Sequence, residues 1–180
     1  AKLSPRAPSP KPQALLLLGT AFSFVHLLDW MCEKGLKFQL PEGSRVMETG
    51  GYKGKSRNMS KAALHALITK QFGIPPSRIV CEYGMSELSS QAYDLTVSSS
   101  RLAPTAPRLF RFPPWARVQI ISPETGREVG EGETGLIRVF DLANVFSVMA
   151  IQTEDSGIRR DDGFELLGRA ALAEPRGCSS

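Results

Sequence analysis

The sequence predicts an α/β protein in which a parallel βαβ layer is followed by a smaller β-rich subdomain. Short apolar runs at 15–18, 44–49 and 78–83 alternate with two helical patterns. The links between them are short, which favours right-handed crossovers and a parallel sheet. After about residue 100 the helical patterns stop, and β segments punctuated by turns follow. The expected organisation is a linker or loop at 1–13, an α/β subdomain at 14–100 and a β-rich subdomain at 101–180.

Both helices are predicted from end signals and from apolar periodicity. The first covers residues 22–33 and ends near Gly35, because glycine commonly closes a helix. The second begins at Ser60, a favourable N-cap, and stops before Pro75-Pro76. Apolar residues recur along both segments at spacings of three and four: Phe24, Leu27, Leu28 and Met31 in the first, and Leu64, Leu67, Ile68 and Phe72 in the second.

The second half is predicted from turn residues and β-rich runs. Residues 98–114 are rich in Ser, Pro and Arg, which predicts a long loop. Strands are expected at 116–121, 134–142 and 145–153. Residues 159–169 predict a hairpin around Asp162-Gly163.

Composition excludes several classes of protein. The chain has 180 residues, 42% hydrophobic and 22% charged, which is typical of a soluble globular protein. Its net charge is +4 and its arginines are dispersed, which favours a solvated basic face and no nucleic-acid partner. Cys32, Cys81 and Cys178 are far apart, so neither a zinc site nor a disulfide framework is expected. This cysteine usage suits a reducing, cytoplasmic compartment.

An apolar stretch at 14–31 resembles a signal peptide. Four prolines crowd the preceding charged region and no initiator Met precedes it, so a buried strand followed by a buried helix is favoured. His26 and Asp29 interrupt the stretch, and no membrane span is expected.

The segment "TGGYKGKS", residues 49–56, is close to a phosphate-binding P-loop but fails the required spacing. Only three residues separate Gly50 from Gly54, and the next helix is expected to begin at Ser60. The pair Gly50-Gly51 instead follows a parallel strand, where backbone can approach a ligand closely. The alternative is an ordinary turn after a strand.

Residues 83–87, Tyr-Gly-Met-Ser-Glu, end the next predicted strand and should lie at the same edge as the glycine pair. The Tyr83 ring could stack on a planar base, and Ser86 could bind a phosphate oxygen. Glu87 could hold Mg²⁺, which prefers carboxylate and phosphate oxygens. Gly84 frees the turn. Each residue alone has a structural explanation, but the combination indicates a nucleotide site.

The segment "EYGMSE" resembles the Tyr-Gly-Met-Thr-Glu signature of the adenylate-forming (AMP-binding) superfamily. Three later segments resemble motifs of that superfamily in the same order: "GETGLIRV" at 132–139, "QTEDSG" at 152–157 and "GFELLGRA" at 163–170. Within it, "METGGYKGKSR", "EYGMSELSSQAYD" and "LGRAALAEPRGCS" are most similar to the LuxE-type acyl-protein synthetases. The phenylacetate-CoA ligases are the neighbouring branch. The resemblance covers about residues 14–179.

The resemblance implies ATP and Mg²⁺ as cofactors. It places Tyr83 on the adenine, and Asp155 and Arg169 on the ribose. Ser86 would lie near the α-phosphate and Glu87 would be the metal ligand, and both are implied to be catalytic. The implied nucleotide-binding residues are Gly50, Gly51, Tyr83, Gly84, Met85, Asp155 and Arg169.

The sequence also departs from the superfamily pattern. Glu154 stands where Gly is usual, and residues 170–172 lack the usual hinge Asp. The phosphate-gripping N-terminal loop and the C-terminal lid domain are not found in the sequence, so the chain is expected to be a fragment. Cys178 is a candidate acyl acceptor by resemblance, because a thiolate attacks a mixed anhydride readily. The alternative interpretation is that Cys178 has no chemical role and is only a small residue packed in a β segment.

The expected function is therefore that of an acyl-protein synthetase, a long-chain fatty acid–protein ligase. It would activate a fatty acid, or another carboxylic acid, as acyl-AMP and pass the acyl group to a thiol. That thiol could be its own Cys, CoA or a reductase partner. The alternatives are a non-catalytic nucleotide-binding or interaction domain of the same type, and a phenylacetate-CoA ligase-like enzyme.

Overall fold

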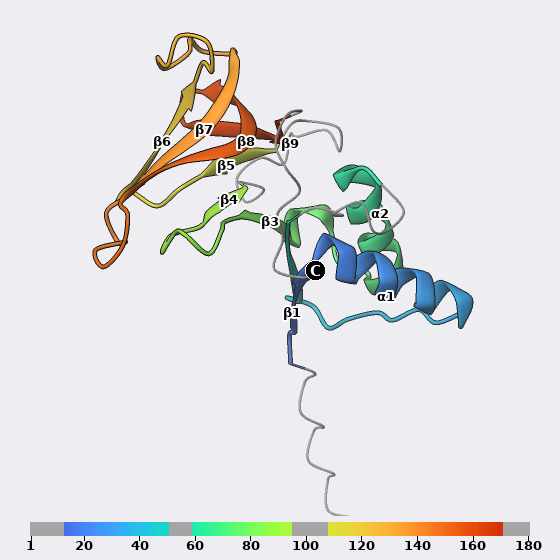
Figure 1. Ribbon diagram of the computed structural model, residues 1–180. Helices are drawn as coiled ribbons and strands as arrows, with labels where there is room; N and C mark the ends of the chain where they lie inside the picture. The colour runs from blue at the N-terminus through green and yellow to red at the C-terminus, as the bar shows by residue number, and fades with distance from the viewer. Residues whose placement is uncertain (1–12, 51–58, 95–107, 171–180) are drawn as a thin grey trace, which may run out of the picture.

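The computed structural model describes residues 13–50, 59–94 and 108–170 (Figure 1). Within these residues nine strands form one sheet in the order β1-β2-β3-β4-β5-β9-β8-β7-β6. The α/β class, with a parallel layer followed by β-rich structure, is confirmed. The elements are β1 (Leu16–Thr20), α1 (Ala21–Glu33), β2 (Arg45–Thr49), α2 (Lys61–Phe72), a 3₁₀ turn (Pro76–Arg78), β3 (Ile79–Tyr83), β4 (Ala92–Asp94), β5 (Leu109–Arg111), β6 (Ala116–Ile121), β7 (Thr134–Asp141), β8 (Ala150–Arg160) and β9 (Gly163–Arg169).

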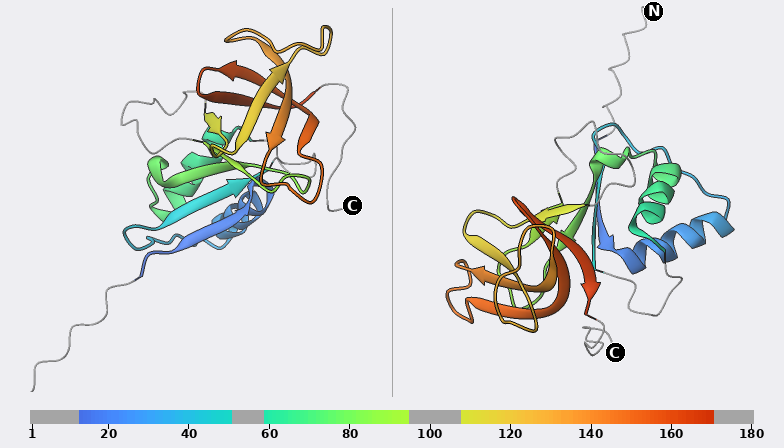
Figure 2. Two further views of the ribbon diagram at one scale, coloured as in Figure 1. Left: turned by 90° about the vertical axis from the view of Figure 1, so that its left-hand side faces the viewer. Right: turned by 90° about the horizontal axis from the view of Figure 1, so that it is seen from above.

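The parallel layer consists of β1, β2 and β3, with α1 and α2 on one side of it (Figures 1 and 2). Thr20 caps α1, since its side chain accepts a hydrogen bond from the Ser23 amide at 3.0 Å. The predicted cap at Ser60 is confirmed, because its side chain accepts from the Ala63 amide at 3.2 Å. Gly73 ends α2 in the left-handed conformation, with φ +69°. Residues 14–31 thus contribute β1 and most of α1.

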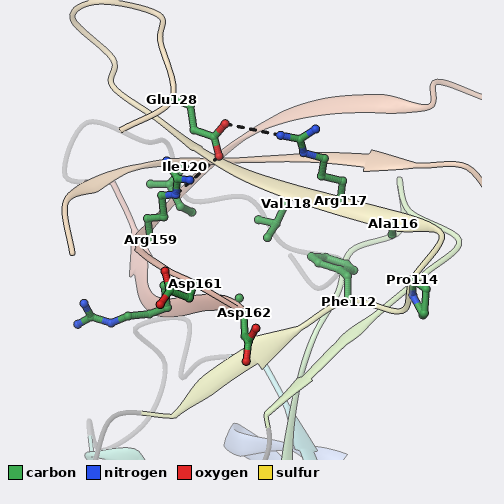
Figure 3. Close-up of a pocket in the computed structure, with 12 residues that line it drawn as sticks. Phe112, Pro114, Ala116, Arg117, Val118, Ile120, Glu128, Arg159, Asp161 and Asp162 are labelled. Atoms are coloured by element: carbon green, nitrogen blue, oxygen red, sulfur yellow. Dashed lines mark ion pairs between the residues drawn. The ribbon is translucent and has the colours of Figure 1, made fainter. Parts of the chain in front are cut away.

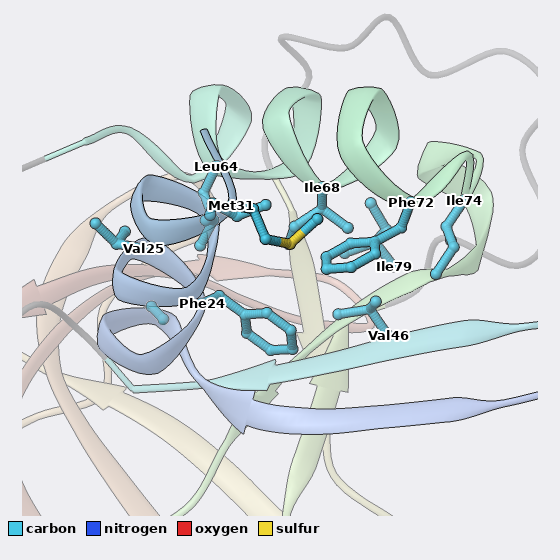
Figure 4. Close-up of a cluster of buried hydrophobic side chains, with 11 residues drawn as sticks. Phe24, Val25, Met31, Val46, Leu64, Ile68, Phe72, Ile74 and Ile79 are labelled. Atoms are coloured by element: carbon cyan, nitrogen blue, oxygen red, sulfur yellow. The ribbon is translucent and has the colours of Figure 1, made fainter. Parts of the chain in front are cut away.

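The first hydrophobic core lies between the two helices and the sheet (Figure 4). Its members are the apolar faces predicted from the helical periodicity, together with strand residues on the helix side. They are Ala21, Phe24, Val25, Leu28, Met31, Val46, Leu64, Ile68, Phe72, Ile74 and Ile79. Neither helix of the described part is long and apolar enough to cross a membrane.

The remaining strands pair antiparallel and curve away from the helices (Figure 2). The hairpin predicted at 159–169 is confirmed as β8 and β9. Arg160 pairs with Gly163, so the turn residues are Asp161 and Asp162, one position earlier than expected. Gly163 lets β9 approach β5 closely, because a Cβ there would lie 2.1 Å from the Phe110 carbonyl oxygen.

Two expectations for this region are wrong. Residues 108–114 of the predicted long loop include β5, and β4 was not predicted. Strands of three residues carry too little alternation to be recognised. The strand expected at 145–153 begins only at Ala150. Its apolar residues Val145, Phe146 and Val148 are exposed, so they imitate a buried strand in sequence alone.

A second core fills the curved part of the sheet, and it draws residues from both sides of residue 100. Its buried members are Cys81, Tyr83, Leu88, Ala92, Phe110, Ile120, Val129, Ile137, Val139 and Phe164. The strand β3 therefore contributes Ile79 to the first core and Cys81 and Tyr83 to the second. The subdomain boundary near residue 100 stays a prediction.

Candidate nucleotide-binding site

Three predicted site residues meet at one place, although they come from three strands. Tyr83 ends β3, and its hydroxyl donates a hydrogen bond to Asp155 Oδ2 at 2.9 Å across 72 residues of sequence. Asp155 of β8 is the register partner of Arg169, the last residue of β9. Arg169 Nε lies 3.7 Å from Asp155 Oδ1. The aromatic residue and the Asp/Arg pair that the resemblance assigns to base and sugar are therefore in contact with one another.

The Tyr83 ring is held by edge contacts with Phe110, Phe112 and Phe164, at centroid distances of 6.4, 6.3 and 5.5 Å. Burial raises the pKa of the Tyr83 hydroxyl, and the Asp155 charge raises it further. Tyr83 is thus a neutral hydrogen-bond donor throughout the physiological range. Only 6% of the residue is exposed, which leaves little ring face for a base, and the stacking role stays a prediction.

Glu154, which replaces the usual Gly, also contacts the predicted sugar site. Arg169 Nη1 donates to Glu154 Oε2 at 2.6 Å. The departure from the superfamily pattern therefore gives Arg169 a second carboxylate partner beside Asp155. The two carboxylates together hold the guanidinium at the end of β9.

Ser86 and Glu87 are exposed residues of the loop between β3 and β4. The Ser86 hydroxyl donates to Glu87 Oε2 at 3.2 Å, so the two predicted catalytic side chains are adjacent. Within the described residues no group of three or more His, Cys, Asp and Glu could hold a metal ion. Glu87 alone would have to share Mg²⁺ with phosphate oxygens, which is the usual way proteins bind this ion.

The loop that carries Glu87 is fixed by Asp141, a residue the sequence did not reveal. Asp141 Oδ2 accepts from the Ser89 and Ser90 amides at 3.0 and 2.7 Å. Asp141 Oδ1 accepts from the Ser90 hydroxyl at 2.8 Å and from the Ala143 amide at 3.0 Å. Burial opposes the charge, but these hydrogen bonds outweigh it and lower the pKa of Asp141.

Asn144 adds a direct contact to the same loop. Its Nδ2 donates to the Glu87 and Val148 carbonyls, each at 2.9 Å. Its Oδ1 accepts from the Ser89 hydroxyl at 3.1 Å. The backbone of Glu87 is thereby tied to the segment between β7 and β8. Since the contacts of Asp141 and Asn144 with residues 87–90 join positions more than fifty apart, no local pattern could have indicated them.

Gly50 and Gly84 occupy the expected strand ends. Gly50 follows β2 with φ +71°, a conformation that favours glycine. A Cβ on Gly84 would lie 2.7 Å from Glu82 Oε1, so a side chain there would crowd the turn. Met85 packs at the margin of the second core. Gly51 and Cys178 lie outside the described residues.

A buried ionic network lies directly behind Gly50. Glu48 of β2 is fully buried, and Lys61 Nζ donates to its two carboxylate oxygens at 2.7 and 2.6 Å. Lys61 also donates to the Gly50 carbonyl at 2.9 Å. His65 Nε2 lies 3.2 Å from Glu48 Oε1. Burial lowers the pKa of His65, so the neutral ring donates from Nε2.

Arg108 and Asp94 extend this network to β4. Arg108 Nη1 lies 2.8 Å from His65 Nδ1, and its Nε pairs with Asp94. Asp94 Oδ1 accepts from the Cys81 amide at 2.7 Å. Burial and Glu48 raise the pKa of the Cys81 thiol to about 12, so it is protonated. The network joins β2, β3, β4 and α2.

A separate pocket of about 490 Å³ lies between β6 and the β8–β9 turn (Figure 3). Phe112, Val118 and Ile120 give it an apolar side. Glu128 faces Arg117 and Arg159 across it, at 3.8 and 3.9 Å. None of the predicted site residues lines this pocket, so it is distinct from the surface around Asp155.

Comparison with protein families gives a match to the family described as "Acyl-protein synthetase, LuxE" over residues 8–180. A curated relative, the long-chain-fatty-acid–luciferin-component ligase of Aliivibrio fischeri, is 24% identical over 177 residues. The alignment covers 92% of this chain and 44% of the relative. The chain therefore spans less than half the length of that relative.

Several solved structures have a similar fold, and two of them were determined with an adenylate or with ATP bound. The McyG A-PCP structure complexed with phenylalanyl-adenylate has a TM-score of 0.61 at 17% identity, and covers 87% of this chain and 30% of its own. ATP-bound MatB from Rhodopseudomonas palustris has a TM-score of 0.58 at 20% identity, covering 87% and 31%. At these identities the likeness concerns the fold alone. The family match, which spans almost the whole chain, shows that this protein belongs to the LuxE family of acyl-protein synthetases.

Proposed function

We propose that this chain provides the nucleoside- and metal-binding part of an ATP-dependent, AMP-forming acyl ligase, a long-chain fatty acid–protein ligase. The observation that carries the proposal is the meeting of Tyr83, Asp155 and Arg169 at one place in the fold. The names of the Aliivibrio relative and of ATP-bound MatB support a fatty acid and ATP as substrates. A cytoplasmic location remains our expectation.

The proposed reaction has two steps. A fatty carboxylate oxygen attacks the α-phosphorus of ATP, the bond to the bridging oxygen breaks, and pyrophosphate leaves. A thiolate then attacks the acyl carbon of acyl-AMP, and AMP leaves. Positioning of the reactants and neutralisation of phosphate charge would supply most of the rate enhancement.

The described residues have roles that fit this chemistry. Asp155 would accept hydrogen bonds from the ribose hydroxyls, and Arg169 would bind beside it. Ser86 would donate to an α-phosphate oxygen. Glu87 would hold Mg²⁺ together with phosphate oxygens, and the ion would neutralise charge that develops on them. The fixed loop around Glu87 supports this role, because an exposed carboxylate positions a metal only when its backbone is held.

Two parts of the proposal concern residues outside the described ranges. Gly51 would approach the adenine together with Gly50. Cys178 would take the acyl group as a thioester, with CoA or a reductase partner as the other candidate acceptors. Replacement of Cys178 by Ser, followed by mass spectrometry after incubation with ATP and a fatty acid, separates acylation at this position from transfer to another thiol.

The nucleotide site can be tested with matched aspartate variants of the full-length protein. Asp155→Ala removes the proposed ribose contact, and Asp161→Ala removes an exposed aspartate on the β8–β9 turn. We expect Asp155→Ala to weaken AMP binding at least about tenfold in calorimetry, because a hydrogen bond to a charged group contributes about 1.5–3 kcal/mol. Asp161→Ala should bind AMP normally. Equal AMP affinity in both variants would refute the assignment.

The alternative of a non-catalytic nucleotide-binding domain makes a different prediction. Such a protein binds AMP but does not exchange pyrophosphate into ATP when a fatty acid is present. The acyl ligase exchanges pyrophosphate, and the exchange depends on the fatty acid. Measuring both quantities on one preparation of the wild-type protein separates the two functions.

A further inference from the structure

In the ionic network next to Gly50, both Glu48 and Lys61 occupy positions that are unfavourable for a charged residue. Glu48 is a fully buried carboxylate in a strand of the sheet interior, where ions are costly. Lys61 is the first residue of α2, where the helix dipole disfavours a positive charge. No acidic residue in the first turn of α2 compensates for it. Departures of this kind in a well-packed core are expected where function requires them.

The geometry identifies what these two residues hold. Lys61 Nζ is within 2.9 Å of three oxygens, two from Glu48 and one from the Gly50 carbonyl. Its side chain is 33% exposed, whereas that of Glu48 is 0% exposed. The buried Glu48 carboxylate therefore fixes the position of the Lys61 ammonium, and the ammonium in turn holds the Gly50 carbonyl in place.

The Gly50 peptide needs such support. It follows the last residue of β2, and in the part of the chain that the structure describes no strand pairs with it, so the Lys61 ammonium is the group seen to bind its carbonyl. Its φ of +71° is accessible to glycine, which is also the residue with the most freedom to leave it. Among the described residues other than its chain neighbours, none lies within 4 Å of where a Cβ of Gly50 would be.

We propose that Lys61 is a positioning residue for the nucleotide site, which fixes the Gly50 turn so that its backbone can approach the base of ATP. The proposal rests on the proposed function, because Gly50 is assigned to the adenine side of that site. Lys61 does not touch the nucleotide in this account. It acts through the Gly50 carbonyl, and its charge is neutralised by Glu48.

The test uses the full-length protein and three substitutions in this network. Glu48→Gln combined with Lys61→Met removes both charges together, so no uncompensated ion remains in the core and the protein can fold. Lys61→Arg keeps the charge and the donors. Thermal unfolding shows whether each variant folds, calorimetry with AMP gives the affinity, and pyrophosphate exchange gives KM for ATP and for the fatty acid.

We expect the double variant to fold, to bind AMP about tenfold more weakly and to raise KM for ATP by the same factor, with KM for the fatty acid unchanged. The single variant Lys61→Arg, which keeps the charge and the donors, should bind AMP with most of the wild-type affinity. If the role of Lys61 were purely structural, the double variant would lose affinity for ATP and for the fatty acid alike, in proportion to its loss of stability. Lys61→Arg would then keep both affinities to the same extent.

Two controls on α2 complete the experiment. Lys70→Met removes an exposed lysine from the last turn of the helix, and Ile68→Val weakens the core below it. Both should bind AMP normally, although Ile68→Val lowers Tm. Unchanged AMP affinity in the double variant, or an equal loss in Ile68→Val, would overturn the inference. Failure of the wild type to bind AMP would instead disprove the proposed function itself, and this inference with it.

Discussion

Replacement of Asp141 by Ala tests how the Glu87 loop is held. Asp141 is 0% exposed and accepts four hydrogen bonds, two of them from Ser90, which is itself only 4% exposed. In the Ala variant water can solvate the amide of the exposed Ser89, but the buried Ser90 amide and hydroxyl each lose their acceptor, although the Ser90 oxygen still accepts from Trp115 Nε1. Two hydrogen bonds to a charged acceptor contribute about 3–6 kcal/mol together, so we expect a loss of this size.

A loss of this size is a large part of the total stability of a domain, which is about 5–15 kcal/mol. It corresponds to a decrease in Tm of about 6–24 °C for a protein of this size. The assays are thermal unfolding followed by circular dichroism, and hydrogen exchange of the Ser89 and Ser90 amides. Both amides should exchange faster than in the wild type, because they donate directly to Asp141.

The matched control is Asp161→Ala, at an exposed position of a turn. A surface substitution of this kind changes the free energy of unfolding by less than about 0.5 kcal/mol. If Asp141→Ala costs less than about 1 kcal/mol, or if protection of the Ser89 and Ser90 amides is unchanged, the loop is not held as described.

Three further predictions concern pH, the Tyr83 hydroxyl and the contact between β5 and β9. The depressed pKa of Asp141 stabilises the folded state above its ordinary value of 3.8, and this stabilisation is lost as pH falls below it. The difference in Tm between wild type and Asp141→Asn should therefore shrink from pH 5 to pH 3, and a constant difference would contradict the assignment. Tyr83→Phe keeps the ring but removes the hydrogen bond that orients Asp155, and calorimetry should show AMP binding weakened about three- to tenfold; unchanged affinity would mean that Asp155 is oriented by other groups. Gly163→Ala forces β9 away from Phe110 and should lower the free energy of unfolding by about 1–3 kcal/mol in urea titrations, whereas wild-type stability would contradict the close approach.

Local signals in the sequence predicted much of the fold. The cap at Ser60 and the strands β1, β2, β3, β6 and β7 follow from residue type and apolar spacing alone. The hairpin of β8 and β9 was also predicted, but its turn lies one residue earlier than expected, so the sequence indicated the hairpin and not its register. These features depend on neighbours in the chain, so a single sequence contains the information.

What the sequence did not indicate depends on contacts between distant segments. Asp141 accepts from Ser89 and Ser90 over more than fifty positions, and Glu48 is neutralised by a lysine on the following helix. In the sequence, Glu48 was a polar residue within one predicted strand, and Asp141 was the next-to-last residue of another, predicted at 134–142. Neither position has a periodicity or a spacing that distinguishes it from a solvent-exposed acid.

The strands β4 and β5 have three residues each, and each adjoining pair along β3-β4-β5-β9 is aligned over two residue pairs. This narrow seam divides the sheet between the strand ends that carry Gly50 and Glu87 and the strands that carry Asp155 and Arg169. A sheet resists bending least where its ladder is shortest, so small tilts between the two halves concentrate there. The hydrogen bond from Tyr83 to Asp155 spans this seam. Together with the hydrogen bonds that Asp141 and Asn144 make to the Glu87 loop, it limits how far the two halves can move relative to one another.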